Sequence, residues 1–229
     1  GGIAKGSGMI HPNMATMLGF ITTDARIEQA LLQKAIAIAG KSSFNRITVD
    51  GDTSTNDCLL VLANGLAKNE PIISEKQDYQ VFLQALTGVC LELAKMIARD
   101  GEGATKLVEI KVSGAKTEEE AVKAGKSVAT SNLVKTALFG EDANWGRILA
   151  VVGYSGVEID PERVSICLGK LPVYQKGVGL VFDETKAKQI LAQKEILINI
   201  DLGDGKEAAS VWTCDLSYDY VKINGSYRS

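Results

Sequence analysis

Hydrophobic and polar residues follow one pattern in the first part of this chain and another after residue 105. In the first part, long segments with apolar residues at helical spacing alternate with short β-prone apolar runs. Asp24 is a good N-cap for the first of these helices, and Gly40 supplies its stop. We therefore expect helices at 24–40 and 74–99 and strands at 17–22, 47–49 and 59–62.

After residue 105 the pattern changes to short strands with shorter helices between them. The sequence Thr117-Glu-Glu-Glu120 has the form of a capping box and predicts a helix start. The other expected helices are 133–139, 145–152 and 184–192, and the expected strands are 107–112, 164–168, 196–200, 208–214 and 220–223. Together the two patterns predict an α/β protein with a domain boundary near residue 105.

Composition is that of an ordinary globular protein. The 229 residues are 45% apolar and 23% charged, enough for one large domain or two smaller ones. A net charge of −3 and a pI near 5.4 give no basic surface for nucleic acid. No apolar run approaches the roughly 20 residues of a membrane span, and the N-terminus lacks the pattern of a signal peptide. We therefore expect neither nucleic acid nor a membrane as a partner.

Cysteine and histidine content limits the chemistry further. The four cysteines form no CxxC pair, and most of them sit among apolar residues: Cys58, Cys90, Cys167 and Cys214. This pattern favours buried free thiols in a reducing compartment over disulfides. His11 is the only histidine, so a His-rich metal site is excluded. Its neighbour Pro12 favours a loop position without a chemical role.

The bond between Ala15 and Thr16 is the candidate site of chemistry. A loop-like segment leads to it and the first expected strand begins directly after it, so a rigid element would hold the threonine. An N-terminal threonine can use its own α-amino group as the base, because that amine has a pKa of about 7.7–8.0. Such an enzyme first cuts its own chain: the Thr16 hydroxyl attacks the Ala15 carbonyl, and water hydrolyses the resulting ester. From the residues alone, an ordinary threonine at a strand start remains the alternative.

Several long motifs, spread over nearly the whole chain, carry a family resemblance. They are Lys5–Phe20, Val49–Asp57, Arg99–Lys106, Leu133–Gly140, Asn144–Leu149 with Gly153–Gly156, and Asn224–Ser229. In this order they resemble the ornithine acetyltransferase family, the glutamate N-acetyltransferases of arginine biosynthesis. Members of that family are cut immediately before the threonine of an Ala-Thr-Met-Leu sequence, which here is Ala15-Thr-Met-Leu18.

The resemblance implies a layered αββα sandwich with an autocatalytic N-terminal threonine nucleophile, followed by a smaller α+β domain. Residues 1–15 would be the tail of the α subunit up to the cleavage bond, and 16–105 the β-subunit part of the catalytic domain. Residues 106–229 would form the smaller domain, whose tail returns to the active site. The implied reaction is a ping-pong transfer, in which Thr16 takes the acetyl group of N2-acetyl-L-ornithine and passes it to L-glutamate.

The resemblance also implies a set of substrate-binding residues: Lys5, Thr16, Glu102, Asn224 and Ser229. The Lys5 ammonium would pair with a substrate carboxylate, and Glu102 would meet the ammonium of ornithine. By themselves these residues also fit a solvated loop charge, a surface turn and a frayed terminal tail. No metal and no bound cofactor are implied, and the use of acetyl-coenzyme A as a second acetyl donor stays open.

Two polar segments receive no chemical step. The Asp50–Asp57 loop does not have the EF-hand spacing and is interpreted as a hydroxyl-rich turn that the family match puts close to the site. In the Asn144–Arg147 segment, Trp145 is interpreted as an anchor that packs the second domain onto the first, and Arg147 as a buried pairing residue.

Partners follow from the resemblance too. In the family, a Thr-Gly pair in a stretch that precedes Gly1 supplies the oxyanion hole, so an α subunit is expected in an α2β2 or higher assembly. The implied location is the cytoplasm, or the mitochondrial matrix or plastid in a eukaryote. Two other functions stay open: an amidase or aminopeptidase of related fold, and a non-catalytic scaffold with an intact Ala15–Thr16 bond.

Overall fold

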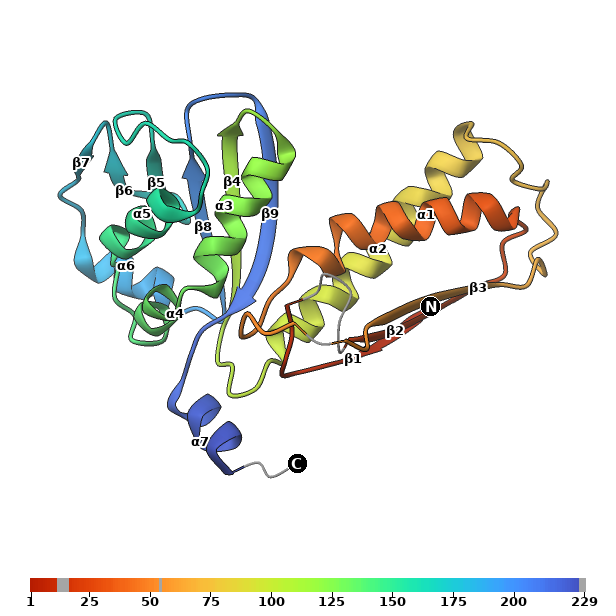
Figure 1. The fold of residues 1–229 in the computed structure, drawn as a ribbon, viewed down its shortest axis with the longest axis horizontal. Coiled ribbons are helices and arrows are strands. Elements are labelled where there is room, and N and C mark those ends of the chain that lie inside the picture. The colour runs from red at the N-terminus through yellow and green to blue at the C-terminus, as the bar shows by residue number, and fades with distance from the viewer. Residues whose placement is uncertain (12–16, 54, 227–229) are drawn as a thin grey trace. The chain divides into compact units, whose positions relative to one another are not determined.

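The computed structural model describes residues 1–11, 17–53 and 55–226, in two compact units, Gly1–Ile97 and Ala98–Ser229 (Figure 1). The described residues contain two β-sheets and seven α-helices, so the predicted α/β class is confirmed. The two units meet between Ile97 and Ala98, and the domain boundary expected near residue 105, where the sequence pattern changes, stays a prediction.

The first unit holds a three-stranded sheet in the order β1-β2-β3, with β1 antiparallel and β3 parallel to β2. A parallel pair needs a crossover, and the first helix provides it. Both long helices lie on one face of this sheet (Figure 1). The elements are β1 Gly2–Lys5, β2 Leu18–Thr23, α1 Gln29–Ser42, β3 Cys58–Ala63 and α2 Gln77–Arg99.

Helix α2 has a buried stripe at helical spacing, formed by Tyr79, Leu86, Cys90, Leu93, Ala94 and Ile97. β1 approaches it closely, because a Cβ added at Gly2 would lie 2.9 Å from a methyl carbon of Leu93. By length and composition alone, α2 could cross a membrane, and 33% of its most apolar 18-residue segment is buried. The expectation that the chain contains no apolar segment long enough to span a membrane is therefore wrong. The buried stripe is typical of the core helix of a globular unit.

Two expectations for the first unit are wrong. The first helix begins at Gln29 rather than near Asp24, because residues 26–28 are held extended by hydrogen bonds with Ile72. No strand forms at 47–49, where a short 3₁₀ helix, η1 Phe44–Arg46, is followed by irregular chain. Strand β1 was not predicted.

The second unit holds a six-stranded sheet in the order β7-β6-β5-β8-β4-β9. β4 pairs in parallel with β8, and all other pairs are antiparallel. The strands are β4 Leu107–Ala115, β5 Ser165–Leu168, β6 Leu171–Gln175, β7 Val178–Gly179, β8 Glu195–Asp201 and β9 Glu207–Cys214. The helices are α3 Glu118–Thr130, α4 Asn132–Phe139, α5 Trp145–Tyr154, α6 Glu184–Leu191 and α7 Tyr218–Ser226.

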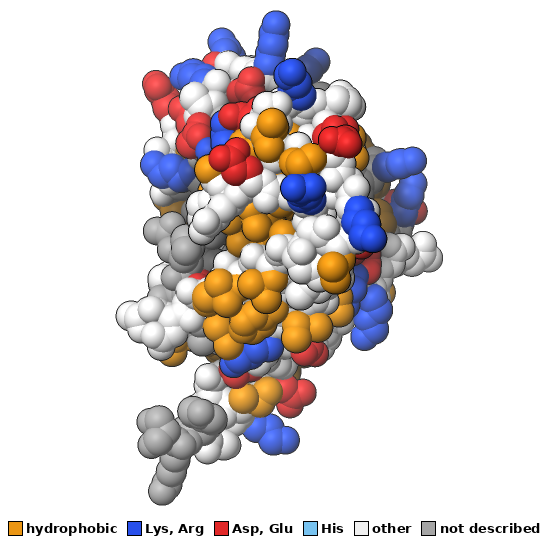
Figure 2. All heavy atoms as spheres, turned by 90° about the vertical axis from the view of Figure 1, so that its right-hand side faces the viewer, with side chains coloured by type: hydrophobic (Ala, Val, Ile, Leu, Met, Phe, Trp, Pro, Cys, Tyr) orange, Lys and Arg blue, Asp and Glu red, His pale blue; other side chains and the backbone are white. Residues whose placement is uncertain are grey.

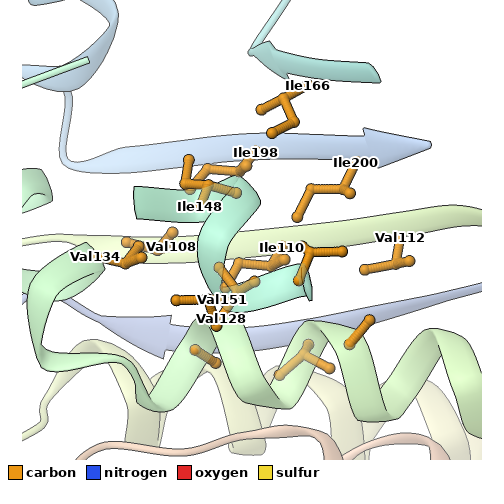
Figure 3. Close-up of a cluster of buried hydrophobic side chains, with 14 of the residues drawn as sticks. Val108, Ile110, Val112, Val128, Val134, Ile148, Val151, Ile166, Ile198 and Ile200 are labelled. Atoms are coloured by element: carbon orange, nitrogen blue, oxygen red, sulfur yellow. The ribbon is translucent and has the colours of Figure 1, made fainter. Parts of the chain in front are cut away.

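One face of this sheet carries the core. In Figure 3, isoleucine and valine side chains of β4, β5 and β8 meet side chains of α3 and α5. Val108, Ile110 and Val112 of β4 are fully buried, whereas Lys111 between them is exposed. This alternation is the one expected of a sheet covered on one face.

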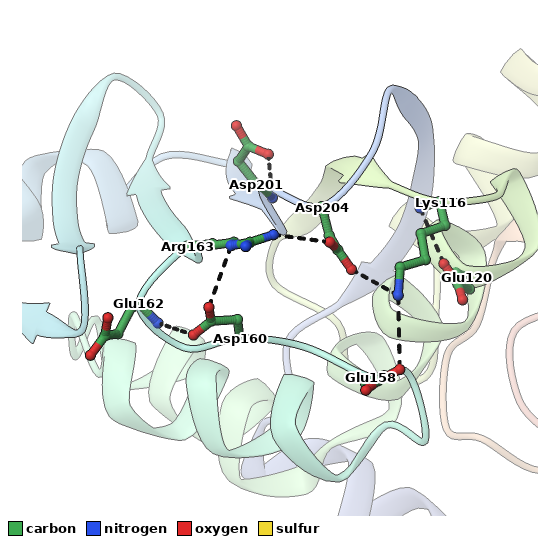
Figure 4. A network of polar contacts seen from close by, with 9 residues as sticks. Lys116, Glu120, Glu158, Asp160, Glu162, Arg163, Asp201 and Asp204 are labelled. Atoms are coloured by element: carbon green, nitrogen blue, oxygen red, sulfur yellow. Dashed lines mark hydrogen bonds and ion pairs between the residues drawn. The ribbon is translucent and has the colours of Figure 1, made fainter.

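Local signals in the second unit are mostly confirmed. Thr117 caps α3 by accepting a hydrogen bond from the Glu120 amide (3.1 Å). A network around Asp204 ties the loops at one end of the sheet together, since its carboxylate lies 3.0 Å from Lys116 and 3.2 Å from Arg163 (Figure 4). The strand expected at 220–223 is wrong, because these residues lie in helix α7.

None of the four cysteines, all of which the structure describes, forms a disulfide, as their spacing predicts, and Cys58 and Cys167 are only partly buried. Cys90 and Cys214 are buried. Burial raises the pKa of the Cys90 thiol to about 11, so this group stays protonated and unreactive at neutral pH.

Candidate functional site

The structure places the residues proposed from the sequence in three groups. Ala15, Thr16 and Ser229 lie outside the described residues. Lys5 belongs to the first unit. Glu102 and Asn224 belong to the second unit, and each unit is described by itself.

Lys5 is the last residue of β1, and its exposed side chain lies at the end of the sheet where β2 begins. In the ladder between the two strands Lys5 pairs with Leu18, the second residue after Thr16. The sheet therefore brings the lysine next to the beginning of the strand that follows the candidate nucleophile.

Glu102 and Asn224 are brought together although 122 positions separate them. The Asn224 amide donates a hydrogen bond to Oε2 of Glu102 (2.9 Å). Because the amide fixes one carboxylate oxygen, the orientation of the Glu102 side chain is restricted while its second oxygen remains able to accept from a ligand.

Gly103 explains how α7 reaches Glu102. Its φ of +67° lies in the left-handed region, and an added Cβ would stand 2.4 Å from the Tyr220 amide nitrogen. The Ser217 hydroxyl donates to the Gly103 carbonyl (2.6 Å), so the helix begins directly on the glycine turn. The glycine-flanked glutamate was recognised from the sequence, and the approach of α7 to it depends on this glycine.

Asp57 is a residue that the sequence analysis left without a role. One oxygen of its carboxylate accepts a hydrogen bond from the backbone amide of Met17, the residue after Thr16. The other oxygen is buried and has no hydrogen-bond partner among the described residues. Burial raises the pKa of this carboxyl, and the hydrogen bond from Met17 opposes the rise only in part.

A small cavity of 160 Å³ adjoins Asp57. Its walls come from the starts of β2 and β3 and from α1, and include Met17, Asp57, Cys58, Ile36, Lys41 and Phe44. A carboxylate with a raised pKa at the edge of an apolar cavity is a candidate functional group. The signal in the sequence was the acid at the end of a polar loop that directly precedes a strand.

The Asn144–Arg147 segment has a structural role. Asn144 caps α5 by accepting from the Arg147 amide (3.2 Å), and the Trp145 ring stacks on Tyr174 at 5.2 Å. The Arg147 guanidinium donates to the carbonyl of Leu133 (2.8 Å). Trp145 thus packs on a ring of the second unit, and its role as an anchor between the domains stays a prediction. Arg147 binds a backbone carbonyl rather than a carboxylate.

Comparison with known proteins places this arrangement in a family, since the sequence model of the ArgJ family matches residues 1–229. The chain belongs to the ArgJ family. It is 58% identical over 229 residues to the arginine biosynthesis bifunctional protein ArgJ of Symbiobacterium thermophilum, covering 100% of this chain and 57% of that protein. It is 53% identical over 229 residues to the ArgJ protein of Geobacillus kaustophilus, covering 100% of this chain and 56% of that protein.

The fold is similar to that of a solved ArgJ protein. A crystal structure of the arginine biosynthesis bifunctional protein ArgJ from Bacillus halodurans matches with a TM-score of 0.90 and 47% identity. The match covers 93% of this chain and 100% of that one. The chain spans a little over half the length of the curated ArgJ relatives, 57% of the Symbiobacterium protein.

Proposed function

We propose that this chain is the nucleophile-bearing part of a self-cleaving ornithine acetyltransferase. It would transfer an acetyl group from N2-acetyl-L-ornithine to L-glutamate through an acetyl ester of Thr16. The observation that carries the proposal is the ArgJ family match over all 229 residues, which includes the Ala15–Thr16 sequence. The names of the relatives place them in arginine biosynthesis.

Maturation would take two steps. The Thr16 hydroxyl attacks the Ala15 carbonyl, and the amide nitrogen of Thr16 leaves as a free amine while an ester forms. Water then hydrolyses the ester and leaves a carboxylate on Ala15 and an N-terminal threonine. The position of the bond shortly before β2 supports this proposal, because the strand begins at Leu18 and fixes the chain just after the nucleophile.

Transfer would use the new α-amino group as the base. It takes the proton of the Thr16 hydroxyl, which attacks the acetyl carbonyl, and ornithine leaves with that proton on its amine. The amine of glutamate then attacks the acetyl ester and releases the enzyme. Each donor of an oxyanion hole is commonly worth about 3–4 kcal/mol, and in the family those donors come from the segment that precedes Gly1.

Substrate binding is assigned to charged and amide groups in both units. Lys5 would pair with a substrate carboxylate and Glu102 with the ammonium of ornithine, its carboxylate oriented by Asn224. The hydrogen bond between Glu102 and Asn224 supports this assignment. Thr16 and Ser229 complete the proposed set and lie outside the described residues.

The need for an α subunit is supported by the uncovered face of the first sheet. Ile3, Phe20 and Leu60 stand side by side across β1, β2 and β3 on the face away from the helices, with 71%, 41% and 46% of their surface exposed. Figure 2 shows exposed hydrophobic side chains grouped on one face of the molecule. A second sheet, contributed by a chain like the part of the ArgJ relatives that this chain does not match, would cover such a face and complete an αββα sandwich.

The experiment is co-expression of this chain with the upstream part of the Symbiobacterium relative that the chain does not match. Mass measurement of the denatured protein should give two pieces divided between Ala15 and Thr16, and Thr16→Ala should stay uncut. With N-acetylornithine the piece that begins at Thr16 should gain one acetyl group, and glutamate should remove it as N-acetylglutamate. An uncut protein would favour the scaffold, and acetate without N-acetylglutamate would favour the amidase.

A further inference from the structure

The loop between η1 and β3 contacts the chain on both sides of the Ala15–Thr16 bond. On the upstream side, the Asp50 carboxylate accepts hydrogen bonds from two successive amides, those of Met9 (2.7 Å) and Ile10 (3.0 Å). One of its oxygens accepts from Met9, and the other accepts from Ile10 and from the Asp52 amide of its own loop (3.2 Å), a geometry that fixes the direction of the chain at this point.

Met9 has a left-handed backbone conformation, with φ of 52°. This conformation is unfavourable by roughly 1–2 kcal/mol for a residue with a Cβ. It persists where surrounding contacts determine it, and such residues cluster at functional sites. Here the Asp50 carboxylate and the full burial of Ile10 hold the turn.

Two threonines of the same loop, Thr48 and Thr53, bind the next part of the upstream segment, as far as His11. The carbonyl of Ile10 accepts from the Thr48 hydroxyl (3.1 Å) and from the Val49 amide (2.7 Å). The Thr53 hydroxyl donates to the His11 carbonyl (3.2 Å), and the imidazole Nδ1 lies 3.1 Å from the Thr48 hydroxyl. The Thr53 hydroxyl, which was expected to satisfy its own loop, therefore binds the segment that leads to the cleavage bond. The Thr48 hydroxyl binds that segment too and also accepts from the Gly51 amide of its own loop (3.2 Å).

On the downstream side, two consecutive residues hold both backbone groups of Met17. Its amide donates to Asp57, and its carbonyl accepts from the Cys58 amide (2.8 Å). Because that amide belongs to the peptide bond between residues 16 and 17, Asp57 acts on the group next to the candidate nucleophile.

We propose that residues 48–53 and 55–58 form a clamp that positions the Ala15–Thr16 bond for attack, with Asp50 holding the upstream arm and Asp57 the downstream arm. The inference rests on the proposed self-cleavage and assigns the loop a role in it. In the uncut chain, Asp50 and Asp57 hold the segments on the two sides of the bond. After the cut, only Asp57 still contacts the peptide group that follows the new N-terminal threonine. Asp57 is therefore a positioning residue for cleavage and for acetyl transfer, and Asp50 mainly for cleavage.

The same acids do not form a metal site in the described part of the chain. No group of three or more potential ligands gathers there, and both oxygens of Asp50 are occupied by amides. Instead, the carboxylates of Asp50 and Asp57 bind backbone amides.

The test compares cleavage rates in the chain co-expressed with the upstream part of the Symbiobacterium relative. Asp57→Ala removes the acceptor, and Asp57→Asn keeps a neutral one, so cleavage should slow by about tenfold or more, with Asn intermediate between Ala and Asp. Asp50→Asn should also slow it. Asp52→Asn is the matched control, because Asp52 is exposed in the same loop and its carboxylate contacts no partner in the described part of the chain.

A structural role would give a different result in thermal unfolding. Burial raises the pKa of Asp57, so the folded protein holds this proton more tightly than the unfolded chain does. Stability linked to Asp57 is therefore lost as pH rises from about the ordinary value of 3.8 through the raised one. Lys41 and Cys58, which line the same cavity, are the titratable neighbours to hold constant. Asp57→Asn should keep or raise the unfolding temperature at pH 7 while it slows cleavage.

Each outcome decides between the two proposals. If the reference and Asp52→Asn proteins are not cut, the proposed function fails and the clamp fails with it. If they are cut and the Asp50 and Asp57 variants are cut as fast, the clamp alone is overturned. A parallel loss of cleavage and unfolding temperature in Asp57→Asn would also overturn it. In samples left to cleave completely, Asp57→Asn should lower kcat for transfer more than Asp50→Asn does, with KM little changed.

Discussion

At the scale of single residues, the structure describes three of the proposed substrate-binding residues, Lys5, Glu102 and Asn224, and it joins the last two by a contact. The two residues come from a glycine turn and from α7, and one hydrogen bond joins their side chains. Their pairing could not be derived from spacing, because nothing in the local sequence relates positions so far apart. The family resemblance named both residues, and the structure supplies the contact between them.

Replacing Asn224 should weaken substrate binding. Asn224→Ala frees the Glu102 carboxylate to rotate, and Asn224→Asp sets a second carboxylate against it, so the loss should be larger for aspartate. We expect KM for N-acetylornithine to rise about tenfold in the completely cut enzyme, roughly the effect of one charge-assisted hydrogen bond. Lys222→Ala, an exposed change on the same helix, is the control. An unchanged KM in both Asn224 variants would remove the pair from the substrate site.

At the scale of elements, local capping signals succeeded where no distant segment competes. Thr117 and Glu120 lie three residues apart and form the predicted cap. Asp24 is an equally good cap by sequence, yet the helix begins later because Ile27 and Glu28 pair with Ile72. Tertiary pairing overrode the local signal there, and the sequence does not reveal which distant segment will pair.

The two helix starts predict different responses to alanine. Thr117→Ala should lower the free energy of unfolding by about 1 kcal/mol, because the Glu120 amide loses its acceptor. Glu28→Ala at the start of α1 should change it by less than about 0.5 kcal/mol, since Glu28 makes no side-chain capping bond. Denaturant unfolding of both variants measures the difference. Equal effects would mean that the cap of α3 contributes nothing specific.

At the scale of the whole molecule, the order of the strands in each sheet could not be predicted from the sequence. β4 lies between β8 and β9, strands that follow it by about ninety residues or more, and periodicity does not encode such pairings. The same holds for the proposed clamp, because Asp57 reaches Met17 only through the parallel pairing of β2 with β3. The strand segments could be recognised from the sequence, but the strands with which they pair could not.

The uncovered face of the first sheet gives the last prediction. Leu60 and Leu62 stand on the same face of β3 with 46% and 66% of their surface exposed, and a buried leucine contributes about 1.5–3 kcal/mol. Changing both to serine should leave the unfolding of the chain alone nearly unchanged and weaken its association with the upstream part of the relative by tenfold or more. Val181→Ser, at a fully exposed position of the second unit, is the control. Two serine hydroxyls buried in a contact between sheets would weaken the association. Association as tight as that of the unaltered chain would therefore mean that another surface binds the upstream part.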